Sequence, residues 1–158
     1  MPVGGGGPIK DVWNRTRDDV TDWWQWHEIY DESGSSGQQR LVAVQRHIDA
    51  VLDARGAGPV RVVSACAGQG RDLLPVLAGR AGRPLLRAWL IELDPRNAAE
   101  ARRLIVEAGL AEIEVVVGDA GTTDAYAGAV PADLLLLCGV FGNISCLLYT
   151  SPSPRDTR

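Results

Sequence analysis

The residues best suited to chemistry in this chain of 158 residues stand directly after three short apolar runs. Residues 60–64 lead into a loop containing Gly68 and Gly70, and glycine lets a backbone approach a ligand closely. The second run ends at Glu92, whose carboxylate can accept hydrogen bonds from both hydroxyls of a ribose. The third is followed by Asp119 and Ala120, which can bind an exocyclic amine and a ring nitrogen. This pattern predicts a nucleoside-binding site.

Two of these residues also have a structural interpretation. Glu92 could be a solvated acid at a strand end, and Asp119 could cap a short helix. The presence of the glycine loop favours the ribose interpretation of Glu92, whereas the two interpretations of Asp119 remain open.

His27 is the candidate general base, and it lies in a segment rich in tryptophan over residues 11–31. The alternative is a partly buried histidine with no catalytic role, while His47 is expected to be solvated or structural. The aromatic segment itself predicts either a lid over a substrate or a cover for the sheet edge or for another subunit.

The chain contains three cysteines, Cys66, Cys138 and Cys146, with no CxxC pair. This odd, widely spaced set predicts neither a disulfide framework nor a metal site. Cys66 and Cys138 lie at the ends of the first and fourth predicted strands, and we expect them to be small buried residues.

The elements that must position these residues alternate between strand and helix. An amphipathic helix is predicted over 38–55, with Leu41, Val44, Ile48, Val51 and Leu52 on one face, and helices also follow residues 72 and 94. Strands are predicted over the ranges 60–64, 86–93, 113–117 and 134–138. The fold class is therefore α/β, a Rossmann-like parallel sheet with helices on both faces, strands 1–4 only, preceded by an N-terminal helical segment.

The chain divides into four predicted parts. Residues 1–10 are a disordered N-terminus, 11–55 a helical or lid segment, 56–145 an incomplete cofactor-binding domain, and 146–158 a non-native tail. The stretch from Cys146 to Asp156 matches, residue for residue, one translation of a sequencing-library transposase adapter, although an ordinary tail rich in serine and proline is the alternative. We therefore expect a truncated, poorly soluble and inactive fragment with an uncovered apolar edge at Leu134–Leu137.

Composition narrows the class of partner. A net charge of −4 gives no bulk attraction to nucleic acid or to an anionic membrane. The longest apolar stretch, 129–141, is interrupted and too short to span a bilayer, and the N-terminus has no signal-peptide core. These features predict a cytoplasmic protein that binds neither nucleic acid nor membrane.

Taken in order, the motifs resemble those of the class I S-adenosylmethionine-dependent methyltransferases. The segment VVSACAGQG has the spacing of that family's first motif, with Ser64 in place of its acid and Cys66 in place of its first glycine. Glu92 precedes Asp94-Pro95 as in the second motif, Asp119-Ala120 matches the third, and Asp133 opens an apolar strand as in the fourth. The resemblance covers residues 38–145.

The resemblance implies S-adenosyl-L-methionine as cofactor and assigns residues to it. The loop would pass beneath the methionine part, Glu92 would hold the ribose, and Asp119-Ala120 the adenine. The implied cofactor-binding set is Ser64, Ala65, Cys66, Gly68, Gly70, Glu92, Asp119, Ala120 and Cys138. Arg71 and Asp72 are close enough in sequence to replace the acid that is missing at Ser64.

The implied activity is in-line methyl transfer to a small molecule, driven mainly by positioning. Residues 139–143 lack the Asn/Asp-Pro-Pro-aromatic sequence of the family's amine-modifying branches, which does not support DNA or protein substrates. One alternative is an NAD(P)-dependent oxidoreductase, disfavoured because Leu73 stands where a dinucleotide site needs a small residue. The other is a non-catalytic binding protein on the same fold, suggested by Ser64 and Cys66.

Overall fold

The structure is a computed structural model that describes residues 22–31, 33–80, 86–138 and 140. The predicted disordered N-terminus (1–10) and the predicted tail (146–158) lie outside these residues.

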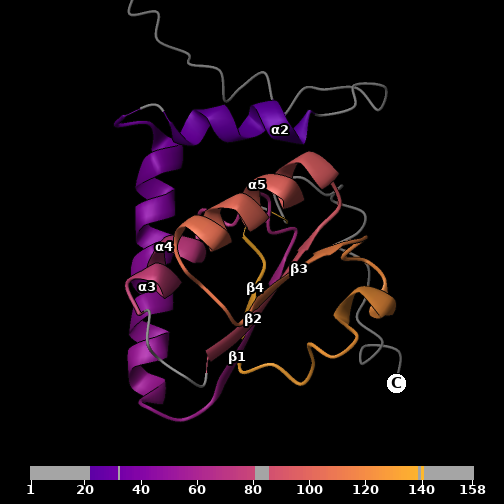
Figure 1. Ribbon diagram of the computed structural model, residues 1–158. Coiled ribbons are helices and arrows are strands. Elements are labelled where there is room, and N and C mark those ends of the chain that lie inside the picture. The colour runs from indigo at the N-terminus through magenta and orange to yellow at the C-terminus, as the bar shows by residue number, and fades with distance from the viewer. Residues whose placement is uncertain (1–21, 32, 81–85, 139, 141–158) are drawn as a thin grey trace, which may run out of the picture.

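The core element is a parallel sheet of four strands in the order β3-β2-β1-β4 (Figure 1). The strands are β1 (Val60–Ala65), β2 (Leu86–Glu92), β3 (Ile113–Val117) and β4 (Leu134–Leu136). Val62 pairs with Ala88 of β2 on one side and with Leu134 of β4 on the other. The order of the strands reverses beside β1, so the carboxyl ends of β1 and β4 flank the crevice where open α/β sheets bind ligands.

The helices begin and end at recognisable signals. Helix α3 (Ser36–Arg55) is capped by the Ser35 hydroxyl, which accepts a hydrogen bond from the Gln38 N–H. Helix α5 (Pro95–Glu107) begins with Asp94 as N-cap, as predicted, and Gly109 follows it with a φ of 65°. The short elements are α2 (Trp23–Trp26), η1 (His27–Tyr30), α4 (Leu74–Ala78) and η2 (Thr123–Tyr126).

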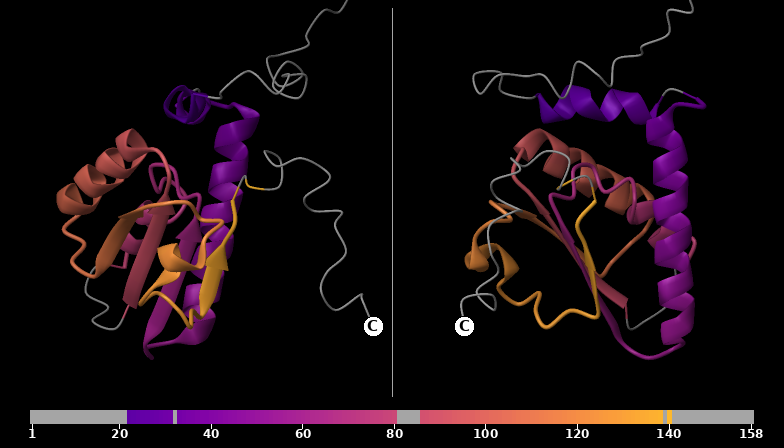
Figure 2. Two further views of the ribbon diagram at one scale, coloured as in Figure 1. Left: turned by 90° about the vertical axis from the view of Figure 1, so that its right-hand side faces the viewer. Right: turned by 180° about the vertical axis from the view of Figure 1, so that it is seen from behind.

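The two faces of the sheet are covered unequally. Ile48 and Leu52 of α3 pack with α4, α5 and one face of the strands in the larger hydrophobic cluster. The opposite face carries a smaller cluster around Val63, Trp89 and Ile91, which is covered by η2 and the loop that ends at Ala129 (Figure 2). Helices thus lie on both faces as predicted, but among the described residues the second face has only a 3-10 helix.

Three predicted details differ from the structure. Helix α3 begins at Ser36, two residues before the predicted start at 38, because Ser35 is a good N-cap. Val51 was predicted on the buried face of this helix, yet it is 40% exposed because Ile48 and Leu52 form the contact line. Strand β4 ends at Leu136, two residues before the predicted end at 138; as the edge strand of the described sheet it leaves Leu135 53% exposed, in line with the uncovered apolar edge predicted at Leu134–Leu137.

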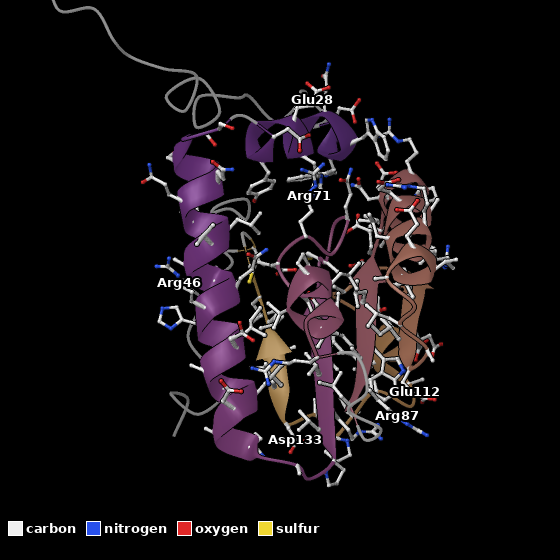
Figure 3. The ribbon with its side chains drawn as sticks, turned by 60° about the vertical axis from the view of Figure 1, so that its left-hand side comes forward. Glu28, Arg46, Arg71, Arg87, Glu112 and Asp133 are labelled. Carbon is white, nitrogen blue, oxygen red and sulfur yellow. The ribbon has the colours of Figure 1, made fainter. Side chains whose placement is uncertain are left out.

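Asp133 joins three elements at the end of the sheet farthest from α2 (Figure 3). Its carboxylate accepts hydrogen bonds from the Arg61 N–H at 2.9 Å and from the Arg55 guanidinium at 2.9 Å. Its own N–H donates to the Arg61 carbonyl. The predicted acid at the start of the fourth strand therefore has a structural role, which is to fix β4 against β1 and the end of α3.

Replacing Asp133 with alanine should lower the free energy of unfolding by about 1–3 kcal/mol, because the Arg61 N–H loses its acceptor. Asp124→Ala, at an exposed acid of η2, is the control and should change stability by less than about 0.5 kcal/mol. Urea denaturation of both variants checks this, and equal stability of the two would contradict the assignment.

Candidate functional site

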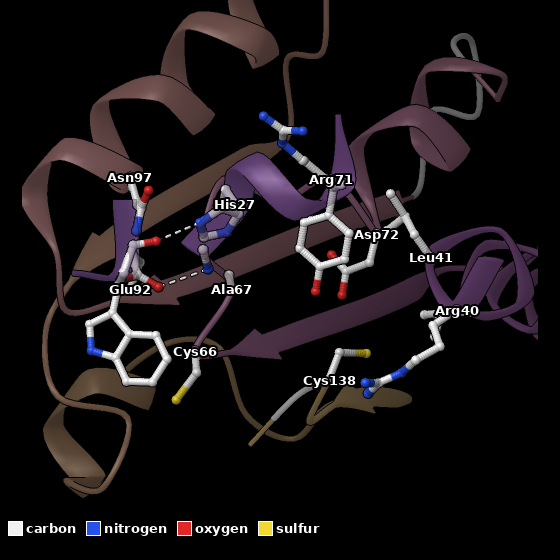
Figure 4. A pocket seen from close by; sticks show the side chains of 14 residues that line it. His27, Arg40, Leu41, Cys66, Ala67, Arg71, Asp72, Glu92, Asn97 and Cys138 are labelled. Carbon is white, nitrogen blue, oxygen red and sulfur yellow. Dashed lines mark hydrogen bonds between the residues drawn. The ribbon is translucent and has the colours of Figure 1, made fainter. Parts of the chain in front are cut away.

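A pocket of about 280 Å³ opens at the carboxyl ends of the strands, beneath α2 and η1 (Figure 4). Its floor comes from residues that follow β1, β2 and β4, and its roof from the aromatic segment and α3. The lining residues that matter below are Trp23, His27, Tyr30, Arg40, Cys66, Gly68, Arg71, Asp72, Glu92, Asn97 and Cys138.

Glu92 is buried and holds the glycine loop in place. One carboxylate oxygen accepts a hydrogen bond from the Gly68 N–H at 2.7 Å, and the other accepts from the Asp94 N–H at 2.9 Å. Each oxygen has a second lone pair, so the carboxylate can still accept hydrogen bonds from a ligand in the pocket. Glu92 is therefore not a solvated strand-end acid.

His27 is held between the lid and the glycine loop. Its Nδ1 lies 2.7 Å from the Trp23 carbonyl, which can only accept, so Nδ1 carries the proton. Its Nε2 accepts from the Gln69 N–H at 3.4 Å, and a Cβ on Gly68 would collide with this ring. Burial lowers the pKa of His27, which keeps the ring neutral. These contacts favour a structural histidine over a catalytic base.

The predicted lid covers the pocket in its described part. Trp23 and Tyr30 line the pocket together with His27, while Trp24 is 39% exposed. Arg71 extends from the glycine loop to the underside of this segment, where its guanidinium donates to Asp31 at 2.5 Å (Figure 3). The contacts favour a lid over a cover for a distant sheet edge.

The two cysteines are neither buried nor activated. Cys66 is exposed and Cys138 is partly exposed, which corrects the expectation that both are buried. Partial desolvation raises the pKa of the Cys66 thiol, and partial desolvation together with the nearby Asp72 raises the pKa of the Cys138 thiol to about 12. Both thiols are therefore protonated near neutral pH.

Cys66 has a φ of 52°, in the left-handed region that favours glycine. The resemblance described above places a glycine at this position, and the backbone explains why. The turn that leaves β1 needs this conformation to carry the chain toward Gly68.

Two buried side-chain atoms have no hydrogen-bond partner in the described part of the chain. They are Oδ1 of Asp72 and Nδ2 of Asn97, and both residues line the pocket. Burial raises the pKa of Asp72. Sequence reasoning named Asp72 only as a substitute acid and missed Asn97 entirely. The only signal for Asn97 is its place in the first turn after Asp94-Pro95.

The other predicted site residues lie outside the pocket lining. Ser64 and Ala65 are buried within β1, and a Cβ on Gly70 would meet Leu74 and Leu90, so this glycine allows core packing. Asp119 is exposed, and its carboxylate accepts from the Gly121 N–H at 2.8 Å, which closes a turn. Asp119 still lies near enough to Cys66 to raise the pKa of that thiol. Ala120 packs against the smaller cluster.

No group of three or more potential metal ligands occurs within the described ranges. Among the helices in those ranges, none is long and apolar enough to cross a membrane.

No family model and no curated protein matches the sequence. Solved structures resemble part of it. Magnesium protoporphyrin IX methyltransferase (ChlM) from Synechocystis PCC 6803 with bound SAM is 15% identical, with a TM-score of 0.48, over 70% of this chain and 52% of that one. A SAM-dependent methyltransferase from Thiobacillus denitrificans is 17% identical, with a TM-score of 0.43, over 65% and 38%. One from Geobacter sulfurreducens is 22% identical, with a TM-score of 0.40, over 49% and 29%.

The chain thus spans between 29% and 52% of the length of these three structures. With identities below 25% and TM-scores below 0.5, these similarities establish neither a family nor a function for the chain.

Replacing Cys66 with glycine should raise the free energy of unfolding by about 0.5–1 kcal/mol, because relief of the left-handed strain exceeds the extra entropy of an unfolded glycine. Ala65→Gly, one residue earlier in β1, is the matched control and should destabilise by at least about 0.5 kcal/mol. Urea denaturation measures both, and a destabilised Cys66→Gly variant would contradict the account.

Stability should fall as the pH is lowered below 6.5, because the unfolded state binds a proton at His27 before the folded state does. His27→Ala should be less stable at pH 7.5 and should show a smaller further loss between pH 6.5 and 5. His47→Ala, at an exposed histidine of α3, should keep the wild-type slope. Thermal melts across this pH range test the prediction, and an unchanged slope in His27→Ala would refute it.

Proposed function

We propose that the pocket binds S-adenosyl-L-methionine and that the protein transfers its methyl group to a small molecule. The observation that carries the proposal is the placement of the two orphaned buried atoms, Asp72 Oδ1 and Asn97 Nδ2, in one pocket with Glu92. Buried polar groups without partners are rare in folded proteins and need an explanation, and a polar ligand supplies one.

The polar groups of the pocket fit the chemistry of this cofactor. Its amino-acid end carries an ammonium and a carboxylate. Asp72 offers a buried carboxyl to the ammonium, in the role that the missing acid at Ser64 would otherwise have. The guanidinium of Arg40 lines the same pocket and can pair with the carboxylate.

The opposite part of the pocket fits a ribose. Glu92 accepts from the Gly68 and Asp94 N–H groups and retains acceptor capacity for two hydroxyls. Asp119 and Ala120 stand beyond Cys66 along the sheet edge, where we assign the adenine. This assignment requires the Asp119 carboxylate to accept from the exocyclic amine as well as from Gly121.

When bound, the cofactor supplies a methyl group on a positively charged sulfur. The acceptor's lone pair would form the new bond to the methyl carbon, and the sulfur would keep the electron pair of the bond that breaks. The chain's residues would orient the reactants and exclude water. Burial raises the pKa of Tyr30 to about 12, and the pKa of Cys138 is also about 12. Both groups are therefore already protonated at neutral pH and cannot accept a proton. We therefore propose an acceptor whose lone pair is available without a base from the described residues.

Calorimetric titration tests the binding step. S-adenosylhomocysteine should bind and NADH should not, and Glu92→Gln should weaken S-adenosylhomocysteine at least tenfold because it weakens both the ribose contact and the loop. Glu112→Gln, at the opposite end of the sheet (Figure 3), is the control and should bind like the wild type. Binding of NADH alone would favour the oxidoreductase alternative. Cofactor binding without methyl transfer from labelled cofactor to any acceptor would favour the non-catalytic one.

The affinity for S-adenosylhomocysteine should fall as the pH is lowered from 8 toward 5. Asp72 has a pKa above its ordinary 3.8 because it is buried, so the carboxyl becomes neutral at a higher pH than usual and then no longer pairs with the ammonium. Asp72→Asn should bind more weakly at pH 8 and should show a flatter pH profile. Titrations at several pH values measure this, and equal profiles would contradict the role of Asp72.

A further inference from the structure

Asn97 is a buried amide whose donor has no use within the described structure. It is 0% exposed, it lies in the first turn of α5, and it lines the pocket. Its Oδ1 accepts from the Gln69 Nε2 at 3.3 Å, whereas its Nδ2 has no partner.

A chain of hydrogen bonds fixes which end of this amide faces the ligand. The Arg71 guanidinium donates to Asp31 of the lid and, through Nε, to the Gln69 Oε1 at 2.9 Å. Because a guanidinium can only donate, Gln69 must turn its oxygen to Arg71 and its nitrogen to Asn97. Asn97 must then present its oxygen to Gln69, which leaves its N–H donors for the pocket.

The neighbour of this donor is the acceptor already described. Consecutive residues of the glycine loop hold the two groups, since the Gly68 N–H binds Glu92 and the Gln69 side chain binds Asn97. Figure 4 shows Asn97 and Glu92 on the same side of the pocket. A ligand hydroxyl can donate to the carboxylate and accept from the amide at the same time.

We propose that Asn97 donates a hydrogen bond to a ribose hydroxyl oxygen of the bound cofactor and so selects ribose over deoxyribose. This inference rests on the proposed function, because it takes Glu92 as the group that accepts from the same ribose. The amide is buried under the lid in the ligand-free arrangement, so the contact forms as the pocket side chains adjust on binding. Asp31, Arg71 and Gln69 are positioning residues that keep the donor aimed at the pocket.

Calorimetry with S-adenosylhomocysteine and its 2′-deoxy and 3′-deoxy analogues tests the inference. For wild type, at least one deoxy analogue should bind at least tenfold more weakly, because it loses contacts to both Glu92 and Asn97. In Asn97→Ala, S-adenosylhomocysteine should weaken about tenfold while that analogue changes less than threefold, so the discrimination collapses. Asn97→Asp keeps the side-chain volume and the acceptor for Gln69 and, when ionised, has no donor, so at pH 8 it should lose the discrimination as well, even if the alanine variant folds poorly. Gln39→Ala, an exposed amide on α3, should retain wild-type discrimination.

The outcomes separate the two claims. If the variants weaken S-adenosylhomocysteine and its deoxy analogues equally, Asn97 is structural and this inference is wrong while the proposed function stands. If wild type binds NADH instead, the proposed function fails. Asn97→Asp is then measured with NADH, and its affinity must still fall tenfold, because NADH also carries ribose. If wild type binds neither ligand, both claims are overturned.

Discussion

The carboxylate of Glu92 determines how the ligand pocket is built. One of its oxygens accepts from Gly68 in the loop after β1, and the other accepts from Asp94 at the start of α5. A single buried acid therefore fixes the glycine loop, the end of β2 and the first turn of a helix relative to one another. The carboxylate accepts from two backbone N–H groups, and its remaining lone pairs are available to the pocket that Glu92 lines. Bonds within the chain thus hold Glu92 and the glycine loop in place, which lowers the cost of ordering these two groups on binding.

The lid depends on the same loop. His27 packs against Gly68 so closely that no other residue fits there, and Arg71 reaches from the loop to Asp31 beyond η1. Two of the hydrogen bonds that hold the lid come from the glycine loop, at Gln69 and Arg71, while another joins Asp22 at the start of α2 to Arg96 of α5. A ligand that shifts the loop would therefore shift the lid as well. The hydrogen bonds that run from Arg71 toward the pocket both point the same way. Arg71 donates to Gln69, and Gln69 donates to Asn97.

Much of this arrangement could be predicted from the sequence, and the exceptions have physical causes. The β-branched runs, the Asp94-Pro95 helix start and the glycines predicted the parallel sheet and placed Gly68 and Glu92 at its ligand-binding edge. Periodicity could not tell Val51 from Ile48, because both fall within one helical stripe and only the packing partners decide. Gly70 was predicted to approach a ligand, but it packs against Leu74 and Leu90 instead. The sequence cannot separate these two cases, because a glycine is needed whether the backbone approaches a ligand or a core side chain. Asn97 escaped prediction because its importance depends on hydrogen-bond partners far away in the chain.

The central claim is that the pocket held together by Glu92 is where S-adenosyl-L-methionine binds. Amide ¹H–¹⁵N spectra of the full chain, recorded during titration with S-adenosylhomocysteine, test it most directly. The N–H groups of Gly68 and Asp94 share the Glu92 carboxylate with the proposed ribose hydroxyls, so their signals should shift most. Saturable binding that leaves both of these signals unmoved while others shift would contradict the account, and so would spectra without any change.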